Sequence, residues 1–208
     1  MINTFCPHSR QRRQSVYSCA MPKLWSETID SHRQAVREAT LDTAAELVAA
    51  HGLASVTMSH IAKMAGIGRA TLYKYFPDVD SILTAWHERQ VGNHLHQLAA
   101  IRDGVGDARE RLKAVLETYA FIAHEHHNIE LASLMHQGGH VVIAREKLVT
   151  LIADLLRQGV KLRQIRDDVA PNELAGYCLY ALSAAGNLPT KAAVLRLVTI
   201  TMAALKPD

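Results

Sequence analysis

Apolar positions recur at helical spacing from about residue 31 onward, and the alternation of apolar and polar positions that marks a strand does not appear. From His32 to Ala50 the residues Leu41, Ala44 and Val48 share one face, and Gly52 follows as a helix stop. Pro and Gly are few and lie at the ends of such segments, and no fixed-period repeat is present. The pattern predicts an all-α protein.

The first 30 residues are polar, dotted with arginines and without periodicity, so we predict a disordered basic tail over residues 1–30. Arg10, Arg12 and Arg13 are followed by no continuous apolar stretch, and tracts of about 18 apolar residues are absent. We therefore expect neither a secretory signal peptide nor a membrane-spanning helix, and we expect a cytoplasmic protein.

Two short helices separated by glycines follow the first long helix. Thr57 is a predicted N-cap, with Val56 and Ile61 at the positions of a hydrophobic staple, and the helix is cut at Gly66. Gly68 caps the next segment, which Pro77 terminates. A second short helix after a tight glycine turn is the helix-turn-helix layout, in which the second helix enters the DNA major groove.

The second short helix combines cations, hydroxyls and aromatic rings on the face opposite Leu72 and Phe76. Arginine forks onto guanine, threonine and tyrosine ring edges meet thymine methyls, and lysine reaches phosphates. Residues 1–76 also hold nine Lys and Arg against five Asp and Glu. From this helix alone, a merely solvated polar face is the alternative interpretation.

The segment Thr57-Met-Ser-His-Ile-Ala-Lys-Met-Ala-Gly-Ile-Gly-Arg-Ala-Thr-Leu-Tyr-Lys-Tyr-Phe-Pro-Asp78 resembles the TetR/AcrR family of bacterial transcriptional regulators. The resemblance covers Ala39 to Leu83. It implies a TetR-like fold, with a three-helix DNA-binding domain, a helical ligand domain and a homodimer that releases its operator when a small molecule binds. It places the DNA-binding residues at Thr57, Ser59, Gly68, Arg69, Thr71, Tyr73, Lys74 and Tyr75.

Two positions depart from the family pattern. Ser59 stands where the family usually has an arginine, and Val79 stands where it usually has a lysine. Both departures remove cations that bind phosphate, so we expect a weaker salt dependence of DNA binding.

From Asp78 to the end the sequence predicts six helices, broken near residues 104–106, 128, 138–139, 167–168 and 187–189. We expect a ligand pocket among the middle helices, because ligand sites in bundles form between facing helices. An ordinary core is the alternative for each candidate lining residue. These residues are Tyr119, Ile122, Ala123, Leu131, Leu134, Met135, Val142 and Leu148.

The last two predicted helices, 171–186 and 190–205, have broad apolar faces and small residues that permit close approach. We expect them to form a two-fold, four-helix dimer interface, with internal packing as the alternative. The predicted interface residues are Leu174, Cys178, Leu182, Val194, Leu195, Val198 and Thr201.

Five of the twelve histidines fall between residues 124 and 140, and His124 and His127 share a helix face. A transition-metal site there is conceivable, but we predict none, since the three cysteines form no Cys-x-x-Cys pair. The glycine-rich and catalytic motifs of common enzyme classes are absent, so we expect no enzyme and no cofactor.

The sequence thus predicts a basic tail at 1–30, a DNA-binding domain at 31–77 and a ligand-binding and dimerisation domain at 78–208. The expected function is a ligand-responsive regulator, most simply a repressor, with an operator duplex and a small, mostly apolar effector as partners. The alternative is a helical small-molecule or metal-binding protein without specific operator recognition.

Overall fold

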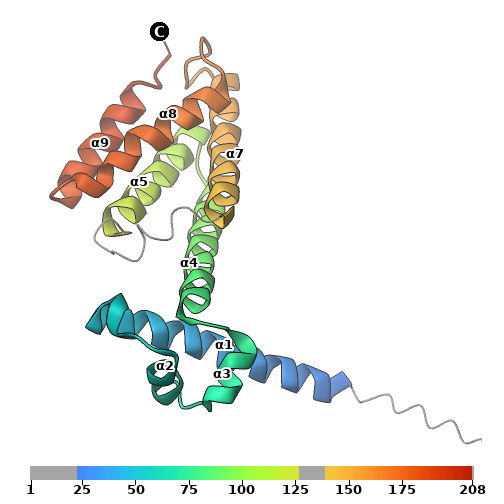
Figure 1. Cartoon of the computed structure of the whole chain (residues 1–208). Coiled ribbons are helices and arrows are strands. Elements are labelled where there is room, and N and C mark those ends of the chain that lie inside the picture. The colour runs from blue at the N-terminus through green and yellow to red at the C-terminus, as the bar shows by residue number, and fades with distance from the viewer. Residues whose placement is uncertain (1–22, 127–138, 208) are drawn as a thin grey trace, which may run out of the picture. The chain divides into compact units, whose positions relative to one another are not determined.

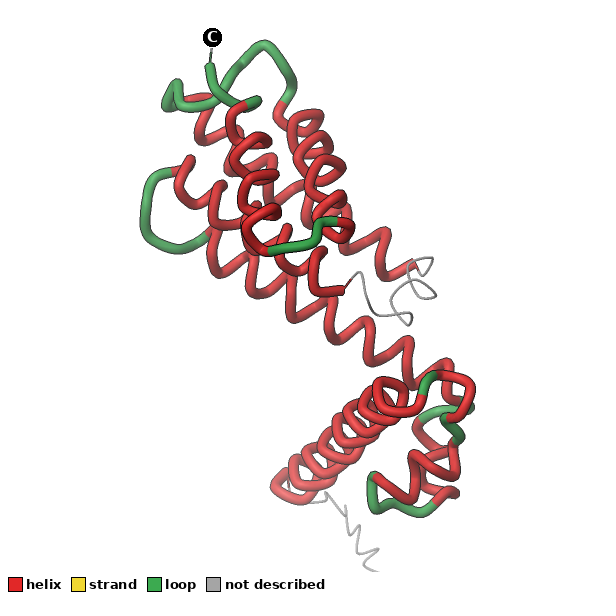
Figure 2. Tube along the Cα trace, turned by 90° about the vertical axis from the view of Figure 1, so that its left-hand side faces the viewer, coloured by secondary structure: helices red, strands yellow, loops and turns green. Residues whose placement is uncertain are grey.

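The protein is described here by a computed structural model, which defines residues 23–126 and 139–207. Within those two ranges every regular element is helical (Figures 1 and 2), which confirms the all-α prediction. The N-terminal elements are α1 (Lys23–His51), the 3-10 turn η1 (Leu53–Ser55), α2 (Met58–Met64) and α3 (Arg69–Tyr75). They are followed by α4 (Val79–Arg102), α5 (Ala108–His126), α7 (Gly139–Lys161), α8 (Pro171–Ser183), the 3-10 turn η2 (Ala184–Asn187) and α9 (Lys191–Ala203).

The predicted tail ends too late, because α1 is helical from Lys23 onward. Its first turns lack an apolar stripe, which is why hydrophobic periodicity did not reveal them. Polar neighbours on the helix surface support them instead: Arg33 pairs with Asp30, and Gln34 donates to Glu38. A boundary between Glu38 and Ala39 divides the chain into two compact units.

The first hydrophobic cluster joins the second half of α1 to α2, α3 and the start of α4. Leu41, Ile61, Leu72, Ile82 and Leu83 are fully buried in it. Leu41 comes from α1, Ile61 from α2 and Leu72 from α3, whereas Ile82 and Leu83 come from the start of α4. Helices as short as α2 and α3 are not stable by helix propensity alone, so the cluster stabilises them by packing them against longer helices.

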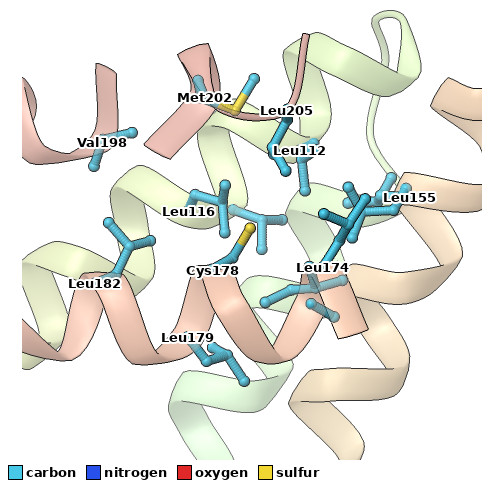
Figure 3. Packing of buried hydrophobic residues seen from close by; sticks show 14 of the residues in the cluster. Leu112, Leu116, Leu155, Leu174, Cys178, Leu179, Leu182, Val198, Met202 and Leu205 are labelled. Carbon is cyan, nitrogen blue, oxygen red and sulfur yellow. The ribbon is translucent and has the colours of Figure 1, made fainter. Parts of the chain in front are cut away.

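The second cluster is the core of a bundle formed by α4, α5, α7, α8 and α9. Figure 3 shows leucines of α5, α7 and α8 meeting around Cys178, with Val198, Met202 and Leu205 closing the α9 side. Helix α7 packs on α4, α5 and α8. Gly159 in α7 is part of this packing, because a Cβ there would lie 2.5 Å from Ile165 Cγ1.

The predicted breaks in the C-terminal part agree with the structure at three places: between α4 and α5, between α7 and α8, and before α9. Pro171 is in the first turn of α8, whereas Pro189 precedes the N-cap Thr190 of α9 and is not in its first turn. The breaks near residues 128 and 138 lie outside the described residues. No helix of the described part is long and apolar enough to cross a membrane.

Candidate nucleic-acid interface

The turn between α2 and α3 is set by a glycine in the left-handed region. Gly66 has φ 69°, its N–H donates to Lys63 O, and the N–H of Ile67 donates to Ala62 O at 3.0 Å. This pair of bonds is the Schellman motif, which satisfies the last carbonyls of α2 and reverses the chain. The sequence located this turn correctly, and its tightness sets where α3 begins.

Both short helices begin at the residues expected. The hydroxyl of Thr57 accepts from the backbone N–H of His60 at 3.2 Å, which confirms the predicted N-cap of α2. Gly68 is the N-cap of α3, and it supplies no side-chain bond to the first turn. The exposed amides at that end therefore remain open to solvent or to an anion.

Helix α3 has a buried side and an exposed side. Leu72 is fully buried and Phe76, just after the helix, is 5% exposed, while Tyr73 on the other side is 55% exposed. Arg69, Thr71 and Lys74 are exposed with Tyr73. Tyr75 differs from the prediction, because it is half-buried and packs against the first cluster.

The guanidinium of Arg69 is bonded back to the preceding helix. Its Nη1 donates to Ser59 Oγ at 3.0 Å, so the first residue of α3 is tied to α2. Hydrophobic spacing does not predict this contact, since the two residues are ten apart and neither is apolar.

Helix α4 starts with a capping box shortly after the end of α3. Asp78 accepts from the N–H of Ser81 at 2.7 Å, and the hydroxyl of Ser81 meets the N–H of Asp78 at 3.4 Å. Further along, His87 Nδ1 lies 2.7 Å from His140 Nε2 on α7, and His140 Nδ1 lies 3.8 Å from a carboxylate oxygen of Glu88. One ring donates to the other, so this partly buried pair ties α4 to the start of α7.

Five of the eight residues predicted to line a ligand pocket lie in the described structure, and Tyr119, Ala123 and Leu148 belong to or pack against the same hydrophobic cluster. Leu131, Leu134 and Met135 lie outside the described residues. Val142 is 58% exposed and Leu148 belongs to the bundle core. Tyr119, Ile122 and Ala123 on α5 are half-buried, and burial raises the pKa of Tyr119 against the opposing influence of Arg145.

A groove of about 690 Å³ does lie along α4 and α7, although the sequence did not single out its residues. The spacing of Gly92, Leu95, His96 and Ala99 along one face of α4 was the available signal. The complete lining is Gly92, Leu95, His96, Ala99, Arg102, Ile143, Glu146, Lys147, Thr150 and Leu151.

Six of the seven residues predicted for the dimer interface are buried within the single chain. Leu174, Cys178, Leu182, Val194, Val198 and Thr201 are between 0% and 6% exposed and belong to the interior of the single chain. Only Leu195, at 41%, remains open to a partner. Within the chain, α8 packs against α5 and α7, and α9 packs against α5.

The histidine cluster is divided by the structure. His124 Nδ1–H donates to Ala185 O at 3.1 Å and so serves as a structural tie between α5 and η2. His127 and His136 lie outside the described residues. In the described ranges no group of three or more His, Cys, Asp or Glu side chains is placed to hold a metal ion.

A helix-turn-helix unit ahead of an all-helical bundle is an arrangement found in DNA-binding transcriptional regulators. Residues 41–85 match the family of bacterial regulatory proteins described as the tetR family. Residues 41–85 accordingly form a helix-turn-helix DNA-binding domain of the tetR family.

Known proteins are similar to this chain over different lengths. The putative mycofactocin biosynthesis transcriptional regulator MftR of Mycobacterium tuberculosis is 39% identical over 75 residues, which are 36% of this chain and 35% of that protein. A TetR/AcrR-family regulator from Thermobifida fusca superposes with a TM-score of 0.71 at 20% identity, over 80% of this chain and 96% of the other.

A FadR from Bacillus subtilis in complex with stearoyl-CoA has a TM-score of 0.64 at 16% identity, over 81% and 98% of the two chains. At such identities the two solved structures establish the fold.

Proposed function

We propose that this protein is a ligand-responsive repressor that binds a palindromic operator as a homodimer and leaves it when a small, mostly apolar effector binds. The observation that carries the proposal is the composition of the exposed side of α3. Arg69, Thr71, Tyr73 and Lys74 stand together on a helix whose opposite side is buried, and they suit base edges and phosphates of a duplex.

The remaining DNA contacts in the proposal follow from the ends of the two short helices. Thr57 and Gly68 lie at helix N-termini, where free amides favour phosphate oxygens, and Ser59 is the second residue of α2. Tyr75, being half-buried, contributes through its exposed edge only. One short helix per subunit reads few bases, so a specific site requires two half-sites about one helical turn apart.

The DNA arm of the proposal is tested by selecting binding sequences from a random duplex library and footprinting the consensus. Arg69→Ala is expected to weaken binding by about 1–3 kcal/mol and to relax the preference at one base pair, whereas Lys74→Ala weakens all sequences alike. Lys113→Ala on α5 is the control cation. Failure to enrich any inverted repeat, with equal losses on random DNA for both variants, contradicts the proposal.

The homodimer is proposed through the outward sides of α8 and α9, next to the residues first expected there. These sides expose large apolar or aromatic groups together with small residues, which is what close helix pairing requires. The residues concerned are Gly176, Tyr177, Tyr180, Ala184, Leu195 and Ile200.

The effector is proposed to be mostly apolar with a polar end. The half-buried wall of α5 at Tyr119, Ile122 and Ala123 and the groove beside α4 offer aliphatic surface with nearby polar groups. A structural relative binds stearoyl-CoA, which has this chemistry, so stearoyl-CoA is a rational first ligand. We expect its affinity to fall when operator DNA is present, since coupling between two sites is reciprocal.

Calorimetric titration of stearoyl-CoA, with and without the selected operator, tests this arm. Dodecyl maltoside below its micelle concentration is the control for nonspecific binding of an alkyl chain. Equal affinity in the two states refutes an inducer role for this ligand.

A further inference from the structure

We infer that Ser59 is a positioning residue, which holds the guanidinium of Arg69 so that its free edge is presented to a guanine. The inference rests on the proposed DNA-binding function and assigns one half-site contact within it. The geometry that carries it is the bond from Arg69 Nη1 to Ser59 Oγ, 3.0 Å long, between α3 and α2.

The bond leaves the useful part of the arginine side chain available. A guanidinium has five N–H donors, and Ser59 takes one of those on Nη1. The edge formed by Nε–H and Nη2–H does not include the nitrogen that Ser59 holds. Two parallel donors on one edge are what the O6 and N7 acceptors of guanine require.

The cost of ordering explains why such a bond matters for recognition. An exposed arginine loses side-chain rotamer entropy when it is fixed. Both Ser59 and Arg69 are exposed, so little burial restrains the side chain before DNA arrives. A bond to a serine fixed on α2 restricts the arginine in the free protein, and less ordering is then left for the binding step.

This role differs from that of a cation at the same position. An arginine at residue 59 would bind phosphate in any sequence, whereas serine carries no charge and adds nothing to counterion release. The serine therefore contributes to base preference rather than to general affinity.

A double-mutant cycle on the selected operator tests the inference. Ser59→Ala is expected to reduce the preference for guanine over adenine at the Arg69 position by about threefold to tenfold, with an unchanged salt slope. In the Arg69→Ala background the same change is expected to have almost no effect. The control cycle of Ser59→Ala with Lys74→Ala is expected to be additive, because Ser59 holds Arg69 and not Lys74.

A second measurement uses the free protein and no DNA. In ¹⁵N-labelled protein, the Nε–H of Arg69 should show reduced mobility in the wild type and increased mobility in Ser59→Ala, with Arg157 as the reference arginine. Unchanged mobility, or equal loss of affinity for every sequence in an additive cycle, overturns the inference. A library that yields no consensus overturns the proposed function instead, and the mobility measurement still decides the role of Ser59.

Discussion

Cys178 shows at the scale of one residue how packing changes chemistry. Its thiol is fully buried among leucines of the bundle (Figure 3), and this desolvation raises its pKa from 9.0 to about 12. A thiol with such a pKa stays neutral in the folded protein and is a poor nucleophile. The residue is therefore a small apolar side chain of the core.

The pKa of Cys178 predicts a loss of stability at alkaline pH. The folded state keeps the proton while the unfolded chain loses it near pH 9, so the contribution is fully present below pH 9 and falls as pH rises toward 12. The expected slope from this group is about 1.4 kcal/mol per pH unit. Urea unfolding of wild type and Cys178→Ala between pH 8 and 10.5 measures it. Parallel pH profiles for the two proteins would refute the assignment.

Residue-level predictions from sequence succeeded where the cause is local. Thr57, Gly66 and Asp78 act through bonds to backbone groups within four residues, so the chain itself specifies them. The bonds of Arg69 to Ser59 and of His87 to His140 join different helices, and nothing in a single sequence fixes such partners.

At the scale of elements, the start of α4 depends on its capping box. Asp78 accepts from the N–H of Ser81 and sits at the positive end of a 24-residue helix. This end of the helix also contributes Ile82 and Leu83 to the first hydrophobic cluster. Fraying here therefore affects the core that supports α3.

Asp78→Ala is expected to destabilise the protein by about 1 kcal/mol, because one amide of the first turn loses its acceptor. For a chain of this size the melting temperature should fall by about 2–4 °C. Asp80→Ala is the matched control, since Asp80 is exposed in the same turn and is not the N-cap, and it should lower stability by only a few tenths of a kcal/mol. Equal shifts for the two variants in thermal unfolding would contradict the role of the cap.

Helices α8 and α9 show why hydrophobic spacing did not separate the inward side chains from the outward ones. Both helices are apolar around most of their circumference, so hydrophobic spacing alone cannot say which side meets the chain's own core. The structure turns Val194 and Val198 inward and leaves Leu195 and Ile200 outward. Sequence therefore predicted where these helices lie more readily than it predicted which of their faces is buried.

For the whole molecule, this division predicts different outcomes for neighbouring substitutions. Leu195→Glu is expected to give a folded protein that sediments as a monomer and loses operator affinity, because its side chain is already in solvent in one chain. Val198→Glu is expected to unfold the bundle, since an unpaired charge would enter a fully buried site. Analytical ultracentrifugation and circular dichroism separate the two results. A folded Leu195→Glu dimer would place the interface elsewhere.

Helix α4 belongs to both hydrophobic clusters, contributing Ile82 and Leu83 to the first and Leu98 to the second. Among the described residues the clusters share no side chain, and Gly92 lies in α4 between these contributions with open space around its Cβ position. Neither core depends on the other for its packing partners. Recombination within the middle of this one helix can therefore join the helix-turn-helix unit to a different helical bundle without redesign of either interior.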